Sequence, residues 1–294
     1  MTHLRSILVI GLVFITVSDA RGVDNRPLAG TAALVDTYDL SDRMVDGAHR
    51  FLDRKLAESI QSRQALWNRD LSSPAAYEKS VQANRVRFTK YIGVIDPPLS
   101  VAMERFGDER NPALVSEMDR WSAYQVRWPV LEGVFGEGLL LEPKGKIQGH
   151  VVAIPDADQT PEQLVGLAPG IPPQSQFARR LVENGFRVIV PVLIDRDTRI
   201  SVNPIATCMT DQPPREWIYR QAYEMGRHVI GYDVRKVLSA VDWLLRARKS
   251  NAKIGVAGYG EGGLIAFYSA AVDRRIDACL VSGYFDSRQQ VWQE

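Results

Sequence analysis

The chain has 294 residues, of which 45% are hydrophobic and 24% are charged, and its formal net charge is +1. These values are ordinary for a globular protein, and the balanced charge gives no reason to expect a nucleic-acid partner. Two cysteines and four histidines show none of the spacings of a zinc site. We therefore expect no metal and no cofactor.

Residues 1–20 are predicted to be a secretory signal peptide. Arg5 supplies a positive start, residues 7–17 are an uncharged and mostly apolar run, and Ser-Asp-Ala at 18–20 offers small residues to a signal peptidase. The run is shorter than the roughly 20 residues that cross a bilayer. We expect an exported chain, secreted or periplasmic, with no membrane partner after cleavage; a short membrane anchor is the alternative.

Residues 21–121 are expected to form a helical N-terminal segment. Apolar residues recur at three- and four-residue spacing from Met44 to Ile60. A second helix opens at Ser73-Pro74, a capping residue followed by a first-turn proline. A third, weaker helix is expected over 112–121. The apolar stripes are too few for an independent core, so this segment should pack against the sheet of the C-terminal part of the chain.

Residues 122–294 are assigned to an α/β domain. Strands and helices alternate along it, which calls for a mostly parallel sheet with helices on both faces. The predicted strands are 124–131, 134–142, 150–155, 186–194, 253–258 and 276–285, and the predicted helices are 174–185, 215–248, with breaks near Gly226 and Gly231, and 264–273. The loop over 195–214 is polar, and we expect its Cys208 not to pair with Cys279.

The sequence IGVAGYGEGG, residues 254–263, predicts a strand, a tight turn and a helix, and two kinds of site fit it. Gly258, Gly260 and Gly263 match the dinucleotide fingerprint G-x-G-x-x-G, and Asp286 lies near the position of a ribose-binding acid. That fingerprint normally opens its domain, whereas here it falls near the end. A dinucleotide-binding oxidoreductase is therefore the weaker alternative.

The second fit is the nucleophile elbow G-x-S-x-G. Gly258 and Gly262 match its flanking glycines, but Gly260 stands at the serine position. An elbow is a sharp and strained strand-to-helix turn, whose neighbours must be small so that backbone can pass close by. The order of the elements before it, an antiparallel pair, a strand, a helix, a strand and a long helical stretch, also fits this interpretation.

Four stretches carry a family resemblance: LLLEPKGKIQGHVVAIPDAD, GFRVIVPVLIDRD, VLSAVDWLLR and IGVAGYGEGGLIAFYSAA. Through them the segment from about 122 to 285 resembles α/β-hydrolases of the dienelactone hydrolase and acetyl xylan esterase kind. The resemblance implies an α/β-hydrolase-like sheet and a ligand that is a small-molecule ester or a carbohydrate. The long helical leader also resembles that of exported members of this group.

The chain departs from the family pattern at the site itself. Members carry serine or cysteine where Gly260 stands, and glycine has no side chain that could attack an acyl carbon. Many members have His-Gly after the third strand, where this chain has Pro-Asp-Ala-Asp, so that Asp156 and Asp158 lie beside an oxyanion hole and oppose its role. The backbone N–H of Glu261 remains as one oxyanion donor.

Two further features indicate a degenerate and truncated domain. The acid and histidine of the triad follow the elbow in this fold, yet no histidine follows His228, and His150 and His228 are expected to be packing or surface residues. After the sixth strand the sequence only opens a helix, which would leave an unpaired sheet edge. We expect the C-terminal strands to be missing and the chain to be a fragment.

The leading hypothesis is an exported pseudoenzyme with a hydrolase-like fold that binds a ligand in the old cleft through Asp156, Asp158 and Tyr259, with Glu261 nearby. The alternative within the same fold is an active hydrolase with a non-standard site, in which Glu261 or Asp156 activates water as a general base. A remnant without function is a further possibility.

Overall fold

A computed structural model describes residues 29–32, 39–198, 202–203, 208–209, 212–247 and 251–286. The predicted signal peptide at 1–20 lies outside these residues. The chain divides into two compact units, residues 1–54 and 55–294. Within the described part of the chain, no helix is long and apolar enough to cross a membrane.

The first unit contains most of helix α1 (Leu40–Ser62), which confirms the helix predicted from its apolar spacing. No residue of α1 is buried, and Met44 is 75% exposed. The spacing therefore predicted the helix correctly, while its apolar stripe is not part of a core.

The second unit opens with the end of α1, a short 3-10 helix η1 (Arg63–Leu66) and α2 (Pro74–Tyr91). The predicted cap is present, because Ser73 Oγ accepts a hydrogen bond from Ala76 N at 3.1 Å. Val81 is the buried residue of α2.

The helix predicted over 112–121 is wrong. Those residues contain strand β2 (Leu114–Glu117), which pairs antiparallel with β3 (Trp121–Leu131), as does the short β1 (Glu104–Arg105). Both edge strands are held by hydrogen bonds to β3, a tertiary interaction that outweighs weak local helix propensity. The segment over 21–121, expected to be helical, therefore contains strands beyond α2.

The sheet of the second unit runs in the order β1-β3-β4-β6-β5-β9-β10, with β2 also beside β3. The remaining strands are β4 (Val134–Pro143), β5 (Gly149–Ile154), β6 (Phe186–Pro191), β9 (Ile254–Tyr259) and β10 (Ala278–Ser282). β6, β5, β9 and β10 are parallel to one another, whereas β3 and β4 form the predicted antiparallel hairpin. This is the mostly parallel, α/β-hydrolase-like sheet that the sequence predicts.

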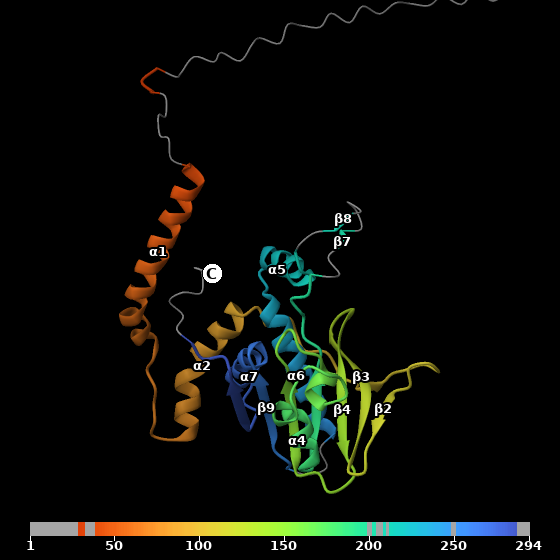
Figure 1. Ribbon diagram of the computed structural model, residues 1–294. Helices are drawn as coiled ribbons and strands as arrows, with labels where there is room; N and C mark the ends of the chain where they lie inside the picture. Colours follow the sequence, from red (N-terminus) through yellow and green to blue (C-terminus); the bar gives the residue numbers. More distant parts are fainter. Residues whose placement is uncertain are drawn as a thin grey trace, which may run out of the picture. The chain divides into compact units, whose positions relative to one another are not determined.

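Helices cover both faces of this sheet (Figure 1). The helices packed on the sheet are α3 (Pro161–Val165), α4 (Phe177–Glu183), α6 (Val229–Ala247) and α7 (Glu261–Val272). The short η2 (Pro173–Ser175) precedes α4, and α5 (Pro214–Glu224) contacts α6. Successive strand residues point to opposite faces. Thus Leu140 and Ile189 pack with α6 and α7, while Leu139 and Val188 pack with α3 and α4.

The predicted break at Gly226 is confirmed, because this glycine has φ of +68° between α5 and α6. The predicted break at Gly231 is wrong, since Gly231 lies inside α6. A Cβ there would collide with the backbone carbonyl of Ile92. Gly231 is therefore explained by close packing of the 92–93 turn on α6 and not by a helix end.

The polar loop over 195–214 contains a two-stranded pair that the sequence did not predict, β7 (Val202–Asn203) with β8 (Cys208–Met209). On the sheet edge, Cys279 is an exposed free cysteine of β10.

Candidate functional site

The sheet topology places a crevice between β5 and β9. The chain leaves β5 toward its neighbour β6 on one side, and leaves β9 toward β10 on the other. In open α/β sheets, ligands bind at such switch points, beyond the carboxyl ends of the strands. Ile154 pairs with Gly258, so the loop at 155–158 and the turn at 259–261 emerge side by side.

The turn after β9 has the backbone of an elbow. Gly260 has φ of +56° and ψ of −122°, a conformation that glycine adopts without strain. A Cβ at Gly262 would collide with the carbonyl oxygens of Ile154 and Pro155, and one at Gly258 with the carbonyl of Gly262. The structure thus gives the flanking glycines the close-approach role that the sequence predicts.

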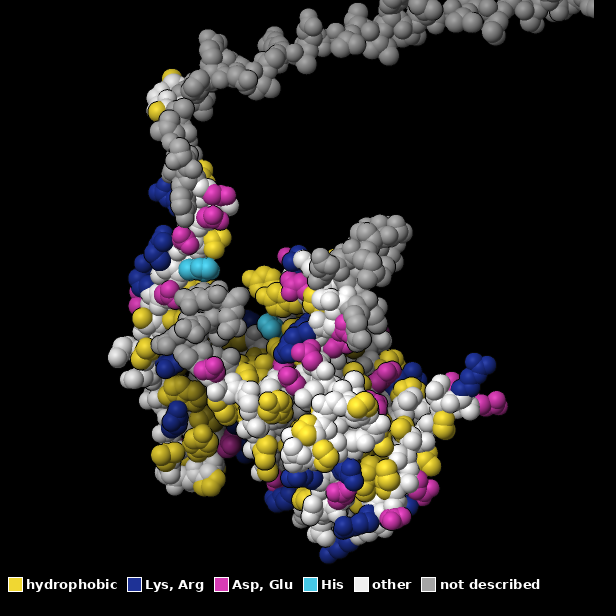
Figure 2. Space-filling view, in the orientation of Figure 1, with side chains coloured by type: hydrophobic (Ala, Val, Ile, Leu, Met, Phe, Trp, Pro, Cys, Tyr) yellow, Lys and Arg dark blue, Asp and Glu magenta, His cyan; other side chains and the backbone are white. Residues whose placement is uncertain are grey.

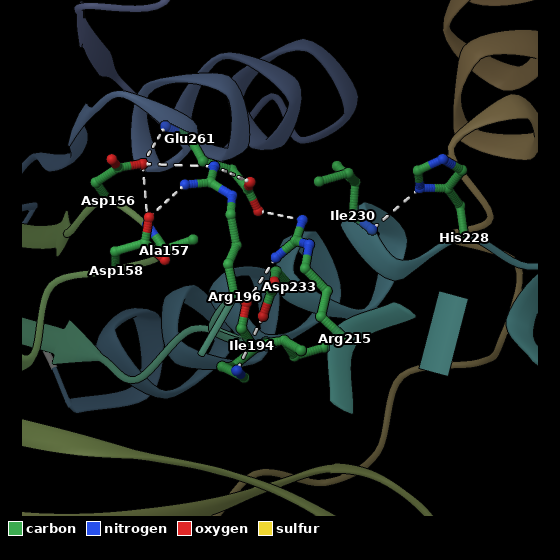
Figure 3. A network of polar contacts seen from close by, with 11 residues as sticks. Asp156, Ala157, Asp158, Ile194, Arg196, Arg215, His228, Ile230, Asp233 and Glu261 are labelled. Carbon is green, nitrogen blue, oxygen red and sulfur yellow. Dashed lines mark hydrogen bonds and ion pairs between the residues drawn. The ribbon is translucent and has the colours of Figure 1, made fainter. Parts of the chain in front are cut away.

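The carboxylate of Asp156 lies against this turn (Figure 3). Its Oδ1 accepts hydrogen bonds from Glu261 N at 2.8 Å and Ala157 N at 2.9 Å. Two converging backbone N–H groups are the kind of donor pair that stabilises an oxyanion. The N–H of Glu261, the predicted oxyanion donor, thus donates to an internal carboxylate.

The same carboxylate fills the space above Gly260. A Cβ built there would lie 2.7 Å from both Cγ and Oδ1 of Asp156. Because these contacts involve the first side-chain atom, a serine at 260 would require the Asp156 side chain to move. The α7 N-terminus, which would hold the pyrophosphate of a dinucleotide, likewise already carries this negative group.

Two arginines hold the side chain of Glu261. Arg215 Nη2 donates to Oε1, and Arg196 Nη2 donates to Oε2 at 2.7 Å. Arg196 also donates to Asp158 Oδ2 at 2.8 Å. Figure 2 shows acidic and basic side chains side by side on this face, between α5 and the strand ends. Both oxygens of Glu261 are thus engaged, which does not favour it as a general base.

The ion pairs with Asp158 and Glu261 raise the pKa of Arg196. Burial alone lowers that pKa, but the hydrogen bonds and negative charges of Asp158 and Glu261 outweigh burial and raise it above the ordinary arginine value. Arg196 and Arg215 were missed in the sequence. Their place in the sequence could have indicated them. Arg196 follows the carboxyl end of β6, where the ligand sites of such sheets lie, and Arg215 lies in the first turn of α5 after the loop that begins there.

A cavity of about 480 Å³ opens beside the elbow. Its lining includes Gln159, Leu164, Ile171, Phe177, Tyr259 and Leu280. Among the described residues that line it, none is an aspartate, glutamate, lysine, arginine or histidine. Tyr259, a predicted ligand-binding residue, is therefore part of an uncharged and largely apolar cavity.

Asp156 and Asp158 are placed differently with respect to that cavity. Asp156 N donates to the side-chain oxygen of Gln159, a lining residue, at 3.3 Å. Asp158 instead lines a second hollow together with Arg196 and Leu193. Of the predicted ligand-binding residues, Tyr259 lines the first cavity and Asp158 lines the second hollow. Asp156 lies next to Gln159, which lines both, and its Oδ1 is 3.9 Å from Arg196 Nη2.

His228 caps a helix, in agreement with the structural role expected for it. Its Nδ1 accepts a hydrogen bond from Ile230 N at 3.1 Å at the start of α6, and its ring packs edge-on against Tyr219. Burial lowers the pKa of His228, and the charge of Arg215 lowers it further. In the described ranges, no cluster of histidine, cysteine and acidic side chains could hold a metal ion.

Comparisons with known proteins agree with this geometry. Residues 140–290, about half of the chain, match the model of the dienelactone hydrolase family. A crystal structure assigned as an acetyl xylan esterase from Bacteroides fragilis NCTC 9343 has a TM-score of 0.51 and 15% identity, over 72% of this chain and 57% of that one.

Other solved structures are more distant. The acetyl xylan esterase from Paenibacillus sp. R4 has a TM-score of 0.41 and 15% identity over 74% of this chain and 62% of its own. The glucuronoyl esterase from Solibacter usitatus has a TM-score of 0.44 and 12% identity over 70% and 58%. This chain thus spans less than two thirds of the length of each of these structures. No curated protein is similar to the sequence at a significant level.

Proposed function

Because the chain belongs to the dienelactone hydrolase family, we propose that it uses the hydrolase cleft to bind a ligand without covalent catalysis. The observation that carries this proposal is the turn at Gly260. The nucleophile position has no side chain, and the Asp156 carboxylate fills the space that a nucleophile would need.

The site is unsuited both to nucleophilic attack and to stabilising the tetrahedral intermediate of acyl transfer. Covalent catalysis needs an activated nucleophile, and Gly260 supplies none. Stabilising the tetrahedral intermediate needs unoccupied N–H donors, yet Glu261 N and Ala157 N both donate to Asp156 Oδ1. An ester carbonyl carries only a partial negative charge, so it competes poorly with a full carboxylate for these donors.

We propose a small, uncharged ligand, either an ester or a carbohydrate. The cavity supports this class, because its lining has aromatic and aliphatic side chains with a few amide and hydroxyl groups and no charged side chain among the described residues. The names of the similar solved structures, which are esterases of xylan acetyl and glucuronoyl groups, point to the same chemistry.

Export is part of the proposal and rests on the signal pattern at 1–20 alone. Intact-mass measurement of the protein purified from a secreting host tests it. Loss of the first 20 residues is expected, and a mass that retains them in the mature fraction contradicts export by this route.

The test of catalysis uses the full chain with p-nitrophenyl acetate and with a fluorophosphonate that labels activated serines. We expect no hydrolysis above buffer and no added mass. The non-standard hydrolase is the rival outcome: saturable turnover that falls in Asp156→Asn or Glu261→Gln would overturn the proposal.

The dinucleotide alternative is tested separately by titrating NADH against tryptophan fluorescence. We expect no saturable change, because the α7 N-terminus already holds the carboxylate of Asp156.

A further inference from the structure

We propose that the cleft recognises a hydroxyl group of its ligand through Asp156, so that the polarity of the site is reversed relative to one built for an ester carbonyl. This inference rests on the proposed binding function and names its ligand class: an uncharged molecule with a ring and at least one alcohol or phenol group.

The elbow presents a hydrogen-bond acceptor to a ligand. The two N–H donors of Ala157 and Glu261 are directed at Asp156 Oδ1. Oδ2 of Asp156 makes no hydrogen bond to any residue that the structure describes, and Figure 3 shows it directed away from the network. An ionised carboxylate is an acceptor only, so a ligand must offer a hydrogen-bond donor here.

A ligand in the cavity can reach this acceptor. The Asp156 side chain is 26% exposed and is therefore within reach of solvent and of a ligand. Gln159, which accepts a hydrogen bond from Asp156 N, lines the cavity, and so do Gly258 and Tyr259, the two residues before the elbow tip. Asp156 is not itself a lining residue of this cavity, so the ligand must extend past Gln159 and Tyr259 to place a hydroxyl at Oδ2.

The charges around the cavity disfavour an anionic ligand. The cavity lining has no charged side chain among the described residues. The two nearby arginines are already paired, Arg215 with Glu261 and Arg196 with Asp156, Asp158 and Glu261. A carboxylate ligand would therefore meet the negative charge of Asp156 without a free cation to balance it.

The lining of the cavity suits a ring. Tyr259 and Phe177 provide aromatic surface, while Leu164 and Ile171 provide aliphatic surface. These groups suit a flat or puckered ring, and hydrogen-bonding side chains such as Gln159 suit further polar substituents. A ring that carries a hydroxyl therefore matches both the cavity and the adjacent carboxylate.

The experiment uses three probes that share one ring: methyl 4-hydroxybenzoate, methyl 4-methoxybenzoate and 4-hydroxybenzoate. Each is titrated calorimetrically into the full chain. We expect the uncharged phenol to bind roughly tenfold or more tightly than its methyl ether, which has no donor, because a hydrogen bond to a charged acceptor is stronger than one between neutral groups. The charged probe, which keeps the phenol, should bind most weakly.

The matched variant is Asp156→Asn, whose side chain has nearly the same shape as aspartate. Its amide oxygen can still accept the hydrogen bonds from Ala157 N and Glu261 N. Its NH₂ group, a donor, then takes the place of the acceptor Oδ2. We expect the preference for the phenol over the methyl ether to disappear or reverse. Glu224→Gln, an exposed change on α5, is the control that should leave the preference unchanged. Circular dichroism verifies that both variants fold.

The outcomes separate the two proposals. Equal affinity of the wild-type chain for the phenol and the ether overturns the hydroxyl inference while leaving ligand binding intact. Binding of none of the three probes overturns the inference together with the binding function. A preference that survives Asp156→Asn also overturns the inference, because the discrimination would then come from another group.

Discussion

The two segments that meet at the switch point have diverged in different ways. The turn after β9 keeps the close-packed glycines and the positive φ of an elbow, whereas the loop after β5 places a carboxylate on the donors of that elbow. The backbone geometry of the site is therefore independent of its chemistry. The flanking glycines are required by close packing, Gly262 against Ile154 and Pro155 and Gly258 against Gly262, and this requirement does not depend on the side chain at position 260.

The largest effect on stability is expected at Gly262, where the start of α7 packs closely against the backbone after β5. Gly262→Ala places a methyl group of α7 against the carbonyl oxygens of Ile154 and Pro155. We expect it to lower the free energy of unfolding by about 3 kcal/mol or more, because the end of β5 cannot shift without loss of its pairing with β9. Urea unfolding measures this. The control is Gly145→Ala, where nothing lies within 4 Å of the added Cβ; a similar effect in both variants would contradict the packing role of Gly262.

The next effect tests whether the loop and the turn are coupled. Gly260→Ser should lower the unfolding free energy by about 1–3 kcal/mol, because it forces a positive φ on a residue with a side chain and crowds the Asp156 carboxylate. We also expect it to gain no esterase activity. In the double variant with Asp156→Ala the crowding is absent, so the serine should cost less by about 1 kcal/mol. Strict additivity of the two changes would show that the segments are independent.

A third comparison separates the two arginines that hold Glu261. Arg215 is 14% exposed and Arg196 is 43% exposed, and Glu261 itself is 9% exposed. Arg215→Met should lower the unfolding free energy by about 2–3 kcal/mol, because it leaves a buried carboxylate with one partner fewer. Arg196→Met should cost less than about 1 kcal/mol, as expected for a solvent-exposed pair. Equal losses in the two denaturation curves would contradict this order.

The sequence predicted most of the fold because its signals are local. The strands predicted at 124–131 and 134–142 correspond to the β3–β4 hairpin, and the glycine at 226 indicated the break between α5 and α6. β2 was missed because it is held by pairing with β3, and Gly231 was misinterpreted because its close neighbour, Ile92, is distant in sequence.

The site likewise combines features that are local in the sequence with contacts between residues that are distant in it. The elbow glycines lie within five residues of one another, so their spacing was visible in the sequence. The sequence also placed Asp156 beside the oxyanion donors. It did not show that this carboxylate accepts from Glu261 N, 105 residues away, or that Arg196 and Arg215 hold the Glu261 side chain. Such contacts depend on strand order, which a single sequence does not specify.

The smallest effect concerns pH and involves His228, at the edge of the same network. Its pKa in the folded chain lies below the ordinary value of 6.5, first because of burial and then because of Arg215, while Glu261 opposes the shift. The unfolded chain therefore binds the proton more readily, and this contribution to stability is present above about pH 6.5 and is lost as the pH falls toward the folded pKa. Protonation also removes the Nδ1 acceptor that caps α6.

His228→Asn keeps a helix cap without a titrating ring. Unfolding free energies at pH 7.5 and pH 5 should differ less in this variant than in the wild-type chain, by well under about 1 kcal/mol because the half-exposed ring is screened by solvent. The Glu224→Gln variant, whose charge is not among the causes of the His228 pKa shift, should keep the wild-type pH dependence. An unchanged pH dependence in His228→Asn would assign the effect to other groups and would mean that the charge network beside the elbow does not extend to the start of α6.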